Sequence, residues 1–156
     1  GKTASLMASS CRVGATTAGH SPAVREALTT YGRCFGMVYQ LRDDVLDMTA
    51  VDGQLGKPAG QDLAEGVYNL PALYALQDPV AGPRLRELLG RPLNDDEREE
   101  ARSLVVSTDG VDKTLLAAQS FLAEADEALA IVDPGLRSAL GSLLAGLLED
   151  LPVPQR

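Results

Sequence analysis

Three aspartates, Asp43, Asp44 and Asp47, stand at spacings of i, i+1 and i+4 in the segment Y-Q-L-R-D-D-V-L-D. On a helix these spacings bring the carboxylates to neighbouring positions, with Gln40 one turn earlier. Like charges placed so close destabilise a helix by roughly 0.2–0.5 kcal/mol per pair, so the cluster favours a bound cation. Carboxylate oxygens suit a hard ion. Mg²⁺ is the natural candidate, because it takes one or two carboxylates and completes its octahedron with water and phosphate oxygens.

The alternative interpretation places the aspartates on a solvated helix surface, as is usual for an isolated D-D-x-x-D pattern. The flanking residues argue against it, because residues 31–48 are too apolar for an exposed helix. The apolar members of this segment are Tyr31, Cys34, Phe35, Met37, Val38, Tyr39, Leu41, Val45, Leu46 and Met48. We therefore expect the carboxylates to line a cleft.

A glycine-rich segment, residues 56–66, follows the acidic cluster and carries Lys57. Its three glycines and one proline predict a tight loop, whose backbone would fix the position of the lysine. Asp62 and Glu65 stand three residues apart in this segment. A structural role, as an N-cap followed by a first-turn acid, explains this pair as well as a functional role does. The segment thus places a cation just beyond the acidic cluster.

The two segments Y-Q-L-R-D-D-V-L-D and G-K-P-A-G-Q-D-L-A-E-G-V-Y-N-L-P together resemble the second aspartate-rich region of the trans-isoprenyl (polyprenyl) diphosphate synthases. The opening G-K-T-A is similar to the Lys-Thr motif of that family. The resemblance extends over residues 1–156, which correspond to the C-terminal half of a synthase domain. Its specific motifs lie in residues 1–71. A P-loop is the competing interpretation of Gly1-Lys2-Thr3, and it is weak because residues 4–17 are predicted to be helical in an otherwise helical chain.

The resemblance implies a magnesium-dependent trans-prenyltransferase, which condenses isopentenyl diphosphate with an allylic prenyl diphosphate and releases diphosphate. In such an enzyme the three aspartates would hold Mg²⁺, directly or through water, while Lys2 and Lys57 would contact the allylic diphosphate. Thr3 and Gln40 would lie beside the reacting carbon and orient it without transferring protons. These residue types suit the reaction, because ionisation places negative charge on the departing diphosphate, where magnesium and lysines stabilise it.

Two departures from the family pattern bear on activity. Val67 stands where most members have a lysine, so one phosphate-facing cation is missing. The first aspartate-rich motif has no counterpart in residues 1–156, since Asp95-Asp96 is typical of helix capping and a solvated face. We therefore expect this chain to be inactive alone, as a fragment. A non-catalytic subunit or truncated paralogue that acts as a helical interaction partner is the alternative, and a class I terpene cyclase fits the lysine-bearing loop less well.

The composition, 45% hydrophobic and 23% charged, is that of a soluble globular protein. A formal net charge of −8 disfavours nucleic acid and anionic membranes as partners. We recognise no signal peptide or transmembrane segment, because charged residues interrupt the most apolar stretch, residues 136–151. Cys11 and Cys34 stand in apolar helical contexts and are expected to be reduced, buried thiols, which favours a cytoplasmic location. The resemblance implies a homodimer for the full-length parent.

The chain is predicted to be all-α, and the resemblance makes it the C-terminal part of the isoprenoid synthase helical bundle. Ser21-Pro22 supply an N-cap and an N1 proline for a long helix that reaches the acidic cluster. After the glycine loop, one helix is predicted from about Leu63 through Leu76, with a kink at Pro71. The other predicted helices span residues 3–17, 84–89, 95–107 and 111–132, a last one starts at 133–134, and residues 151–156 form a frayed tail.

Small residues recur on the first two predicted helices, among them Gly14, Gly32 and Gly36. They would either line an isoprenoid tunnel or let the two helices pack closely. Close packing is the commoner use of such residues, and we expect it here.

Overall fold

A computed structural model describes residues 1–50, 58–149 and 151, and in this part of the chain it contains helices and turns but no strand. The predicted all-α class is therefore confirmed. The described residues form two compact units: unit 1 holds residues 1–42 and 117–149, and unit 2 holds residues 43–50, 58–116 and 151. Each unit has its own hydrophobic core.

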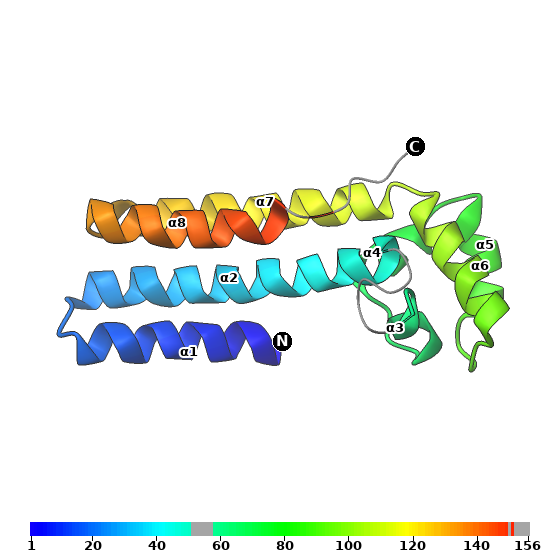
Figure 1. The fold of residues 1–156 in the computed structure, drawn as a ribbon, viewed down its shortest axis with the longest axis horizontal. Helices are drawn as coiled ribbons and strands as arrows, with labels where there is room; N and C mark the ends of the chain where they lie inside the picture. Colours follow the sequence, from blue (N-terminus) through cyan, green and yellow to red (C-terminus); the bar gives the residue numbers. More distant parts are fainter. Residues whose placement is uncertain (51–57, 150, 152–156) are drawn as a thin grey trace. The chain divides into compact units, whose positions relative to one another are not determined.

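Unit 1 is built from long helices, two of which, α2 and α7, also carry residues of unit 2. The helices are α1 (Lys2–Thr17), α2 (Pro22–Thr49), α7 (Gly110–Ala128), the 3₁₀ turn η1 (Leu129–Ile131) and α8 (Pro134–Glu149). Unit 2 adds four short helices, which are α3 (Gln61–Ala64), α4 (Leu70–Ala75), α5 (Ala81–Leu88) and α6 (Asp95–Val106). Figure 1 labels the helices α1 to α8 along the chain.

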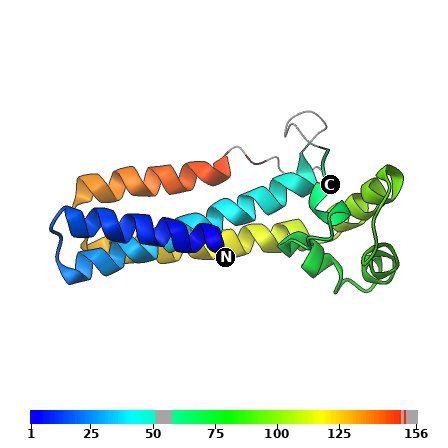
Figure 2. The ribbon, with the colours of Figure 1, turned by 90° about the horizontal axis from the view of Figure 1, so that it is seen from below.

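Helices α1 and α2 run antiparallel and side by side (Figures 1 and 2). Two glycines of α2 permit this approach. A Cβ atom built on Gly36 would lie 2.6 Å from the Cα atom of Ala4, and one built on Gly32 would lie 2.6 Å from the carbonyl oxygen of Met7. No side chain fits at such distances from backbone atoms, so these glycines serve the close packing that we expected.

The start of α2 follows the sequence signal. The hydroxyl of Ser21 accepts the backbone N–H of Val24 at 3.3 Å, and Pro22 is the first helical residue. A side-chain oxygen here satisfies one of the four N–H groups that lack an intrahelical partner at a helix start. The predicted N-cap and N1 proline are confirmed.

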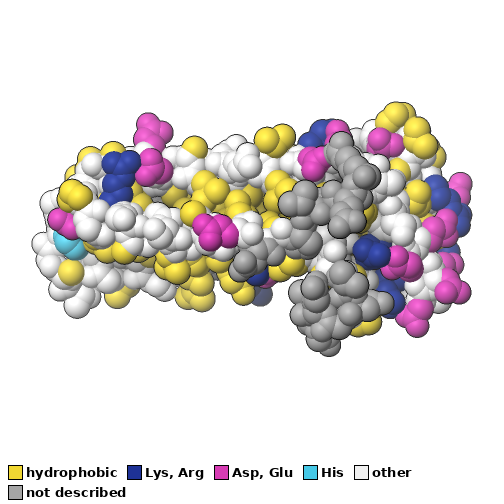
Figure 3. Space-filling model, turned by 45° about the horizontal axis from the view of Figure 1, so that its top comes forward, with side chains coloured by type: hydrophobic (Ala, Val, Ile, Leu, Met, Phe, Trp, Pro, Cys, Tyr) yellow, Lys and Arg dark blue, Asp and Glu magenta, His cyan; other side chains and the backbone are white. Residues whose placement is uncertain are grey.

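The core of unit 1 lies between α2 and the C-terminal helices, and Figure 3 shows hydrophobic side chains running along this unit between its helices. The Tyr31 hydroxyl donates to the Leu140 carbonyl oxygen at 3.0 Å, which ties α2 to α8. Both cysteines are free thiols, as expected, and Cys34 is fully buried. Cys11 is only half-buried, so its predicted burial is wrong. Burial raises the pKa of Cys34 to about 11, so this side chain stays protonated and acts as a small apolar group.

The prediction of a single helix from Leu63 through Leu76 is wrong, because the structure has two helices there, α3 and α4. The first ends in a Schellman motif, in which Gly66 adopts a φ of 75° and Val67 N–H donates to the Asp62 carbonyl oxygen at 2.8 Å. The second begins afresh at Asn69, whose side-chain oxygen accepts the Ala72 N–H at 3.3 Å. Pro71 therefore lies in the first turn of a new helix, where its missing N–H costs nothing, and it does not kink an existing one.

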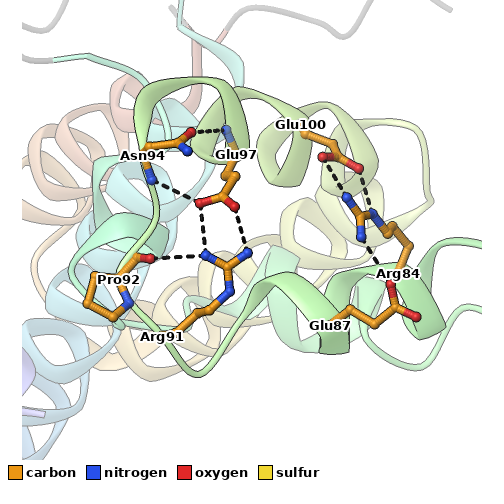
Figure 4. A network of polar contacts seen from close by, with 7 residues as sticks. All are labelled: Arg84, Glu87, Arg91, Pro92, Asn94, Glu97 and Glu100. Atoms are coloured by element: carbon orange, nitrogen blue, oxygen red, sulfur yellow. Dashed lines mark hydrogen bonds and ion pairs between the residues drawn. The ribbon is translucent and has the colours of Figure 1, made fainter.

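An ion-pair network joins α5 to α6 within unit 2 (Figure 4). Arg84 of α5 makes a two-pronged contact with Glu100 at 2.7 and 3.0 Å, and Arg91 does the same with Glu97 at 2.6 and 2.9 Å. Asn94 caps α6 and forms a capping box with Glu97, so the cap is one residue before the predicted Asp95-Asp96 pair. Asp95 and Asp96 are exposed acids of the first turn, as expected.

We expect Glu97→Gln to destabilise unit 2 at neutral pH and to have less effect in acid. The bond from Arg91, helped by the Asn94 N–H, lowers the pKa of Glu97 to about 2 from an ordinary 4.5. Because the folded-state pKa is depressed, the stabilisation is fully present above pH 4.5 and is lost as the pH falls towards 2. Urea midpoints of wild type and variant should therefore differ at pH 7 and converge near pH 2, and a difference independent of pH would contradict the ion-pair explanation.

Candidate functional site

The three aspartates lie in the last two turns of α2, which ends at Thr49. Asp43 and Asp44 are half-buried, whereas Asp47 is only 2% exposed. The C-terminal end of a helix carries a partial negative charge, so carboxylates there are disfavoured by the helix dipole as well as by one another. This arrangement favours a cation near the end of α2.

Backbone N–H groups of the following segment hold two of these carboxylates. Asp44 Oδ2 accepts the N–H of Leu70 at 3.3 Å, and Asp47 Oδ2 accepts the N–H of Asp62 at 3.3 Å. Both donors lie in the first turn of a short helix, where N–H groups lack intrahelical partners. The glycine-rich segment and α4 therefore fix the orientation of the acidic cluster, which the sequence alone does not indicate.

In unit 1 the structure brings two of the predicted site residues together. The hydroxyl of Thr3 donates to the side-chain oxygen of Gln40 over a long 3.5 Å. Thr3 is half-buried, and Gln40 is exposed. Lys2, which precedes Thr3 in the Lys-Thr motif, is also exposed. Gly36, one turn before Gln40, permits this meeting because it lets the start of α1 approach α2.

The structure describes Val67, one of the two residues singled out in the predicted diphosphate-binding region, but not the other, Lys57. Lys57 lies outside the described residues. Val67, which stands where the resemblance leads us to expect lysine, is described and is 54% exposed. Among residues 1–50, 58–149 and 151, no group of three or more His, Cys, Asp and Glu side chains is placed so that it could hold a metal ion. The assignment of the three aspartates to a metal stays a prediction.

Comparison with known proteins identifies the family. The model of the polyprenyl synthetase family matches residues 1–105, a range that extends beyond the motifs of residues 1–71 and reaches into α6. The chain belongs to the polyprenyl synthetase family. It is 39% identical over 144 residues to decaprenyl-diphosphate synthase subunit 1 of Schizosaccharomyces pombe and 34% identical over 143 residues to heptaprenyl diphosphate synthase component 2 of Bacillus subtilis. Each alignment covers 91% of this chain.

Solved structures of polyprenyl synthetases share the fold. The geranylgeranyl pyrophosphate synthase of Corynebacterium glutamicum, complexed with calcium and isoprenyl diphosphate, superposes with a TM-score of 0.88 at 31% identity over 97% of this chain. The polyprenyl synthase of Caulobacter crescentus, also complexed with calcium and isoprenyl diphosphate, gives 0.86 at 35% identity over 97% of this chain. The all-α isoprenyl synthase fold is therefore established for the described residues.

This polyprenyl synthetase chain is shorter than its relatives. It spans 37% and 41% of the two curated relatives and 48% and 47% of the two solved structures. Across the described part of the chain, the structure holds no helix that is both long and apolar enough to cross a membrane.

Proposed function

We propose that this chain supplies one wall of the active site of a trans-prenyltransferase, which joins isopentenyl diphosphate to an allylic prenyl diphosphate. The observation that carries the proposal is the half-buried pair Asp43 and Asp44 at the dipole-negative end of α2, with Asp44 held by the Leu70 N–H. A bound divalent cation would offset the repulsion between two carboxylates at this end of the helix. Membership of the polyprenyl synthetase family supports the reaction class.

The donor set fits Mg²⁺, because every candidate ligand atom is a carboxylate oxygen. Asp43 and Asp44 are accessible enough to act as ligands. Asp47 is buried and accepts the Asp62 N–H, so it contributes chiefly by holding the start of α3. When bound, the ion would neutralise the negative charge that develops on the leaving diphosphate. Water, substrate phosphate oxygens and a first aspartate-rich motif elsewhere in the parent would complete its coordination.

The other residues act on the substrate itself. Lys2 and Lys57 would bind the diphosphate, which leaves with the electron pair of the broken carbon–oxygen bond. The isopentenyl double bond then attacks the allylic cation, and the new cation passes a proton to the released diphosphate to give the elongated product. The side-chain oxygens of Thr3 and Gln40, which lie 3.5 Å apart, would face the cationic carbon and stabilise it as dipoles, since neither group is a base at neutral pH.

The proposal is tested by incorporation of labelled isopentenyl diphosphate into geranyl or farnesyl diphosphate, with the protein as its gene encodes it and with this chain alone. We expect elongation by the whole gene product in the presence of Mg²⁺, its loss after chelation, and none by the isolated chain. If the gene product does not elongate either primer in the presence of Mg²⁺, the enzyme assignment is wrong.

One observation favours the alternative of a non-catalytic subunit or truncated paralogue. Val67 is 54% exposed at the position where the resemblance leads us to expect a phosphate-binding lysine. Restoring the charge with Val67→Lys discriminates between the two functions. A prenyltransferase should gain affinity for the allylic diphosphate, measured as a lower KM, whereas a non-catalytic subunit should show no turnover with or without the substitution.

A further inference from the structure

The C-terminal end of α2 is held by residues from elsewhere in unit 2. A helix leaves its last four carbonyl groups without intrahelical partners, so each needs another donor. In α2 the Leu46 carbonyl accepts the Ala50 N–H at 2.9 Å, and the Asp47 carbonyl accepts the Gly60 N–H at 2.7 Å. The Met48 carbonyl accepts a hydrogen bond from a side chain of α6, because Arg102 Nη1 donates to it at 2.8 Å.

Arg102 reaches this carbonyl from 54 residues further along the chain, and contacts with Glu99 and Gly60 help to fix its position. Its guanidinium makes a two-pronged ion pair with Glu99, at 2.6 and 2.9 Å. Its aliphatic stem lies against Gly60, where an added Cβ atom would be 3.3 Å from the Arg102 Cβ atom. Gly60 has a φ of 73°, a conformation that glycine adopts at little cost and that lets its N–H reach the Asp47 carbonyl.

These contacts meet at Asp47, the last aspartate of the acidic cluster, and at the residue that follows it. Asp47 is joined to Gly60 through its carbonyl oxygen and to Asp62 through its carboxylate, and Arg102 bonds the next residue of α2 while packing against Gly60. A guanidinium is also a positive charge at the negative end of the helix dipole, where the aspartates make the potential still more negative. Arg102 thus places a fixed positive charge at the end of α2 that also carries the candidate metal ligands.

We propose that Arg102 is a positioning residue, which fastens the end of α2 to the segment that begins at Gly60 and so sets the affinity of the aspartates for a metal-bound diphosphate. The inference rests on the proposed function. Arg102 does not touch the substrate and acts through the backbone on either side of Asp47. Its planar fork serves Glu99 and the Met48 carbonyl at once, which a lysine cannot do.

The test uses the whole gene product with three substitutions. Arg102→Met keeps the stem against Gly60 and removes the donors, and Arg102→Lys keeps the charge without the fork. Arg98→Met is the matched control, because Arg98 lies one turn earlier on α6 and pairs with Asp95 at 2.6 Å in the same i, i+3 manner as Arg102 pairs with Glu99. The measurements are hydrogen exchange at the amides of Gly60 and Asp62, and calorimetric binding of inorganic pyrophosphate with Mg²⁺.

In Arg102→Met we expect exchange of the two amides to speed up by about tenfold and pyrophosphate affinity to fall by about tenfold, since hydrogen bonds from charged donors are among the stronger ones. Arg102→Lys should lower the pyrophosphate affinity by about threefold. Arg98→Met should change neither the exchange rates nor the affinity by more than about twofold. Unchanged exchange and affinity in Arg102→Met, or equal losses in Arg98→Met, overturn the positioning role. If wild type itself fails to bind pyrophosphate, the proposed function is wrong and Arg102 has no ligand to position.

Discussion

Asp43→Asn should reduce kcat/KM for chain elongation by about 10²–10³-fold, the usual cost of removing one group that stabilises transition-state charge. The same change should leave the fold intact and make it slightly more stable. Asn is nearly isosteric with Asp and relieves repulsion from Asp44 and Asp47 as well as from the helix dipole, effects worth a few tenths of a kcal/mol each. A loss of activity combined with a gain in stability identifies a residue kept for function. Steady-state kinetics and urea unfolding measure the two quantities.

Asp96→Asn is the matched control for this prediction. Asp96 is an exposed acid in the first turn of α6, where the helix dipole favours negative charge. Its replacement should therefore lower stability slightly and leave elongation unchanged, the opposite of what we expect for Asp43. If the Asp43 variant retains full activity, that carboxylate does not hold the metal.

Gly36→Ala should lower the free energy of unfolding by about 1–3 kcal/mol, the usual cost of overpacking a close contact. The new methyl group would meet the Cα atom of Ala4 at 2.6 Å and its backbone nitrogen at 2.9 Å. Backbone atoms cannot turn aside as a side chain can, so the start of α1 must shift away from α2. Thr3 is carried with it, and the variant should also lose activity because Thr3 moves away from Gln40.

Gly14→Ala provides the comparison, since nothing lies within 4 Å of the Cβ atom that it would add. Alanine is favoured over glycine in a helix by about 1 kcal/mol, so this variant should be as stable as wild type or more so. Urea unfolding followed by circular dichroism measures both. Should Gly36→Ala prove as stable as Gly14→Ala, the close approach of α1 and α2 is not what the glycine at position 36 serves.

Local signals predicted the helices well wherever capping and periodicity agreed. The Ser21-Pro22 start of α2 is an example, because the donor and acceptor are three residues apart. The break between α3 and α4 was missed although its signals are local too: Gly66 ends one helix and Asn69 starts the next. A proline in a helical pattern is compatible with a kink inside one helix and with the first turn of a new one, and Pro71 occupies a first turn.

The supports of the acidic cluster could not be predicted, because they are contacts between residues far apart in the sequence. The Leu70 N–H reaches Asp44 across 26 residues, and Arg102 reaches the Met48 carbonyl across 54. The only sequence signal at Arg102 is its i, i+3 spacing from Glu99, which is common on helix surfaces. Residue types and spacing thus indicate which groups could do the chemistry, while the donors that orient them follow only from the fold.

The most direct test is a crystal structure of the whole gene product with Mg²⁺ and a thio analogue of an allylic diphosphate that cannot ionise. The proposed function predicts that Asp43 or Asp44 would hold a Mg²⁺ ion beside the diphosphate. It also predicts that Lys2 contacts the same diphosphate. A diphosphate bound with its metal away from both aspartates would contradict the account.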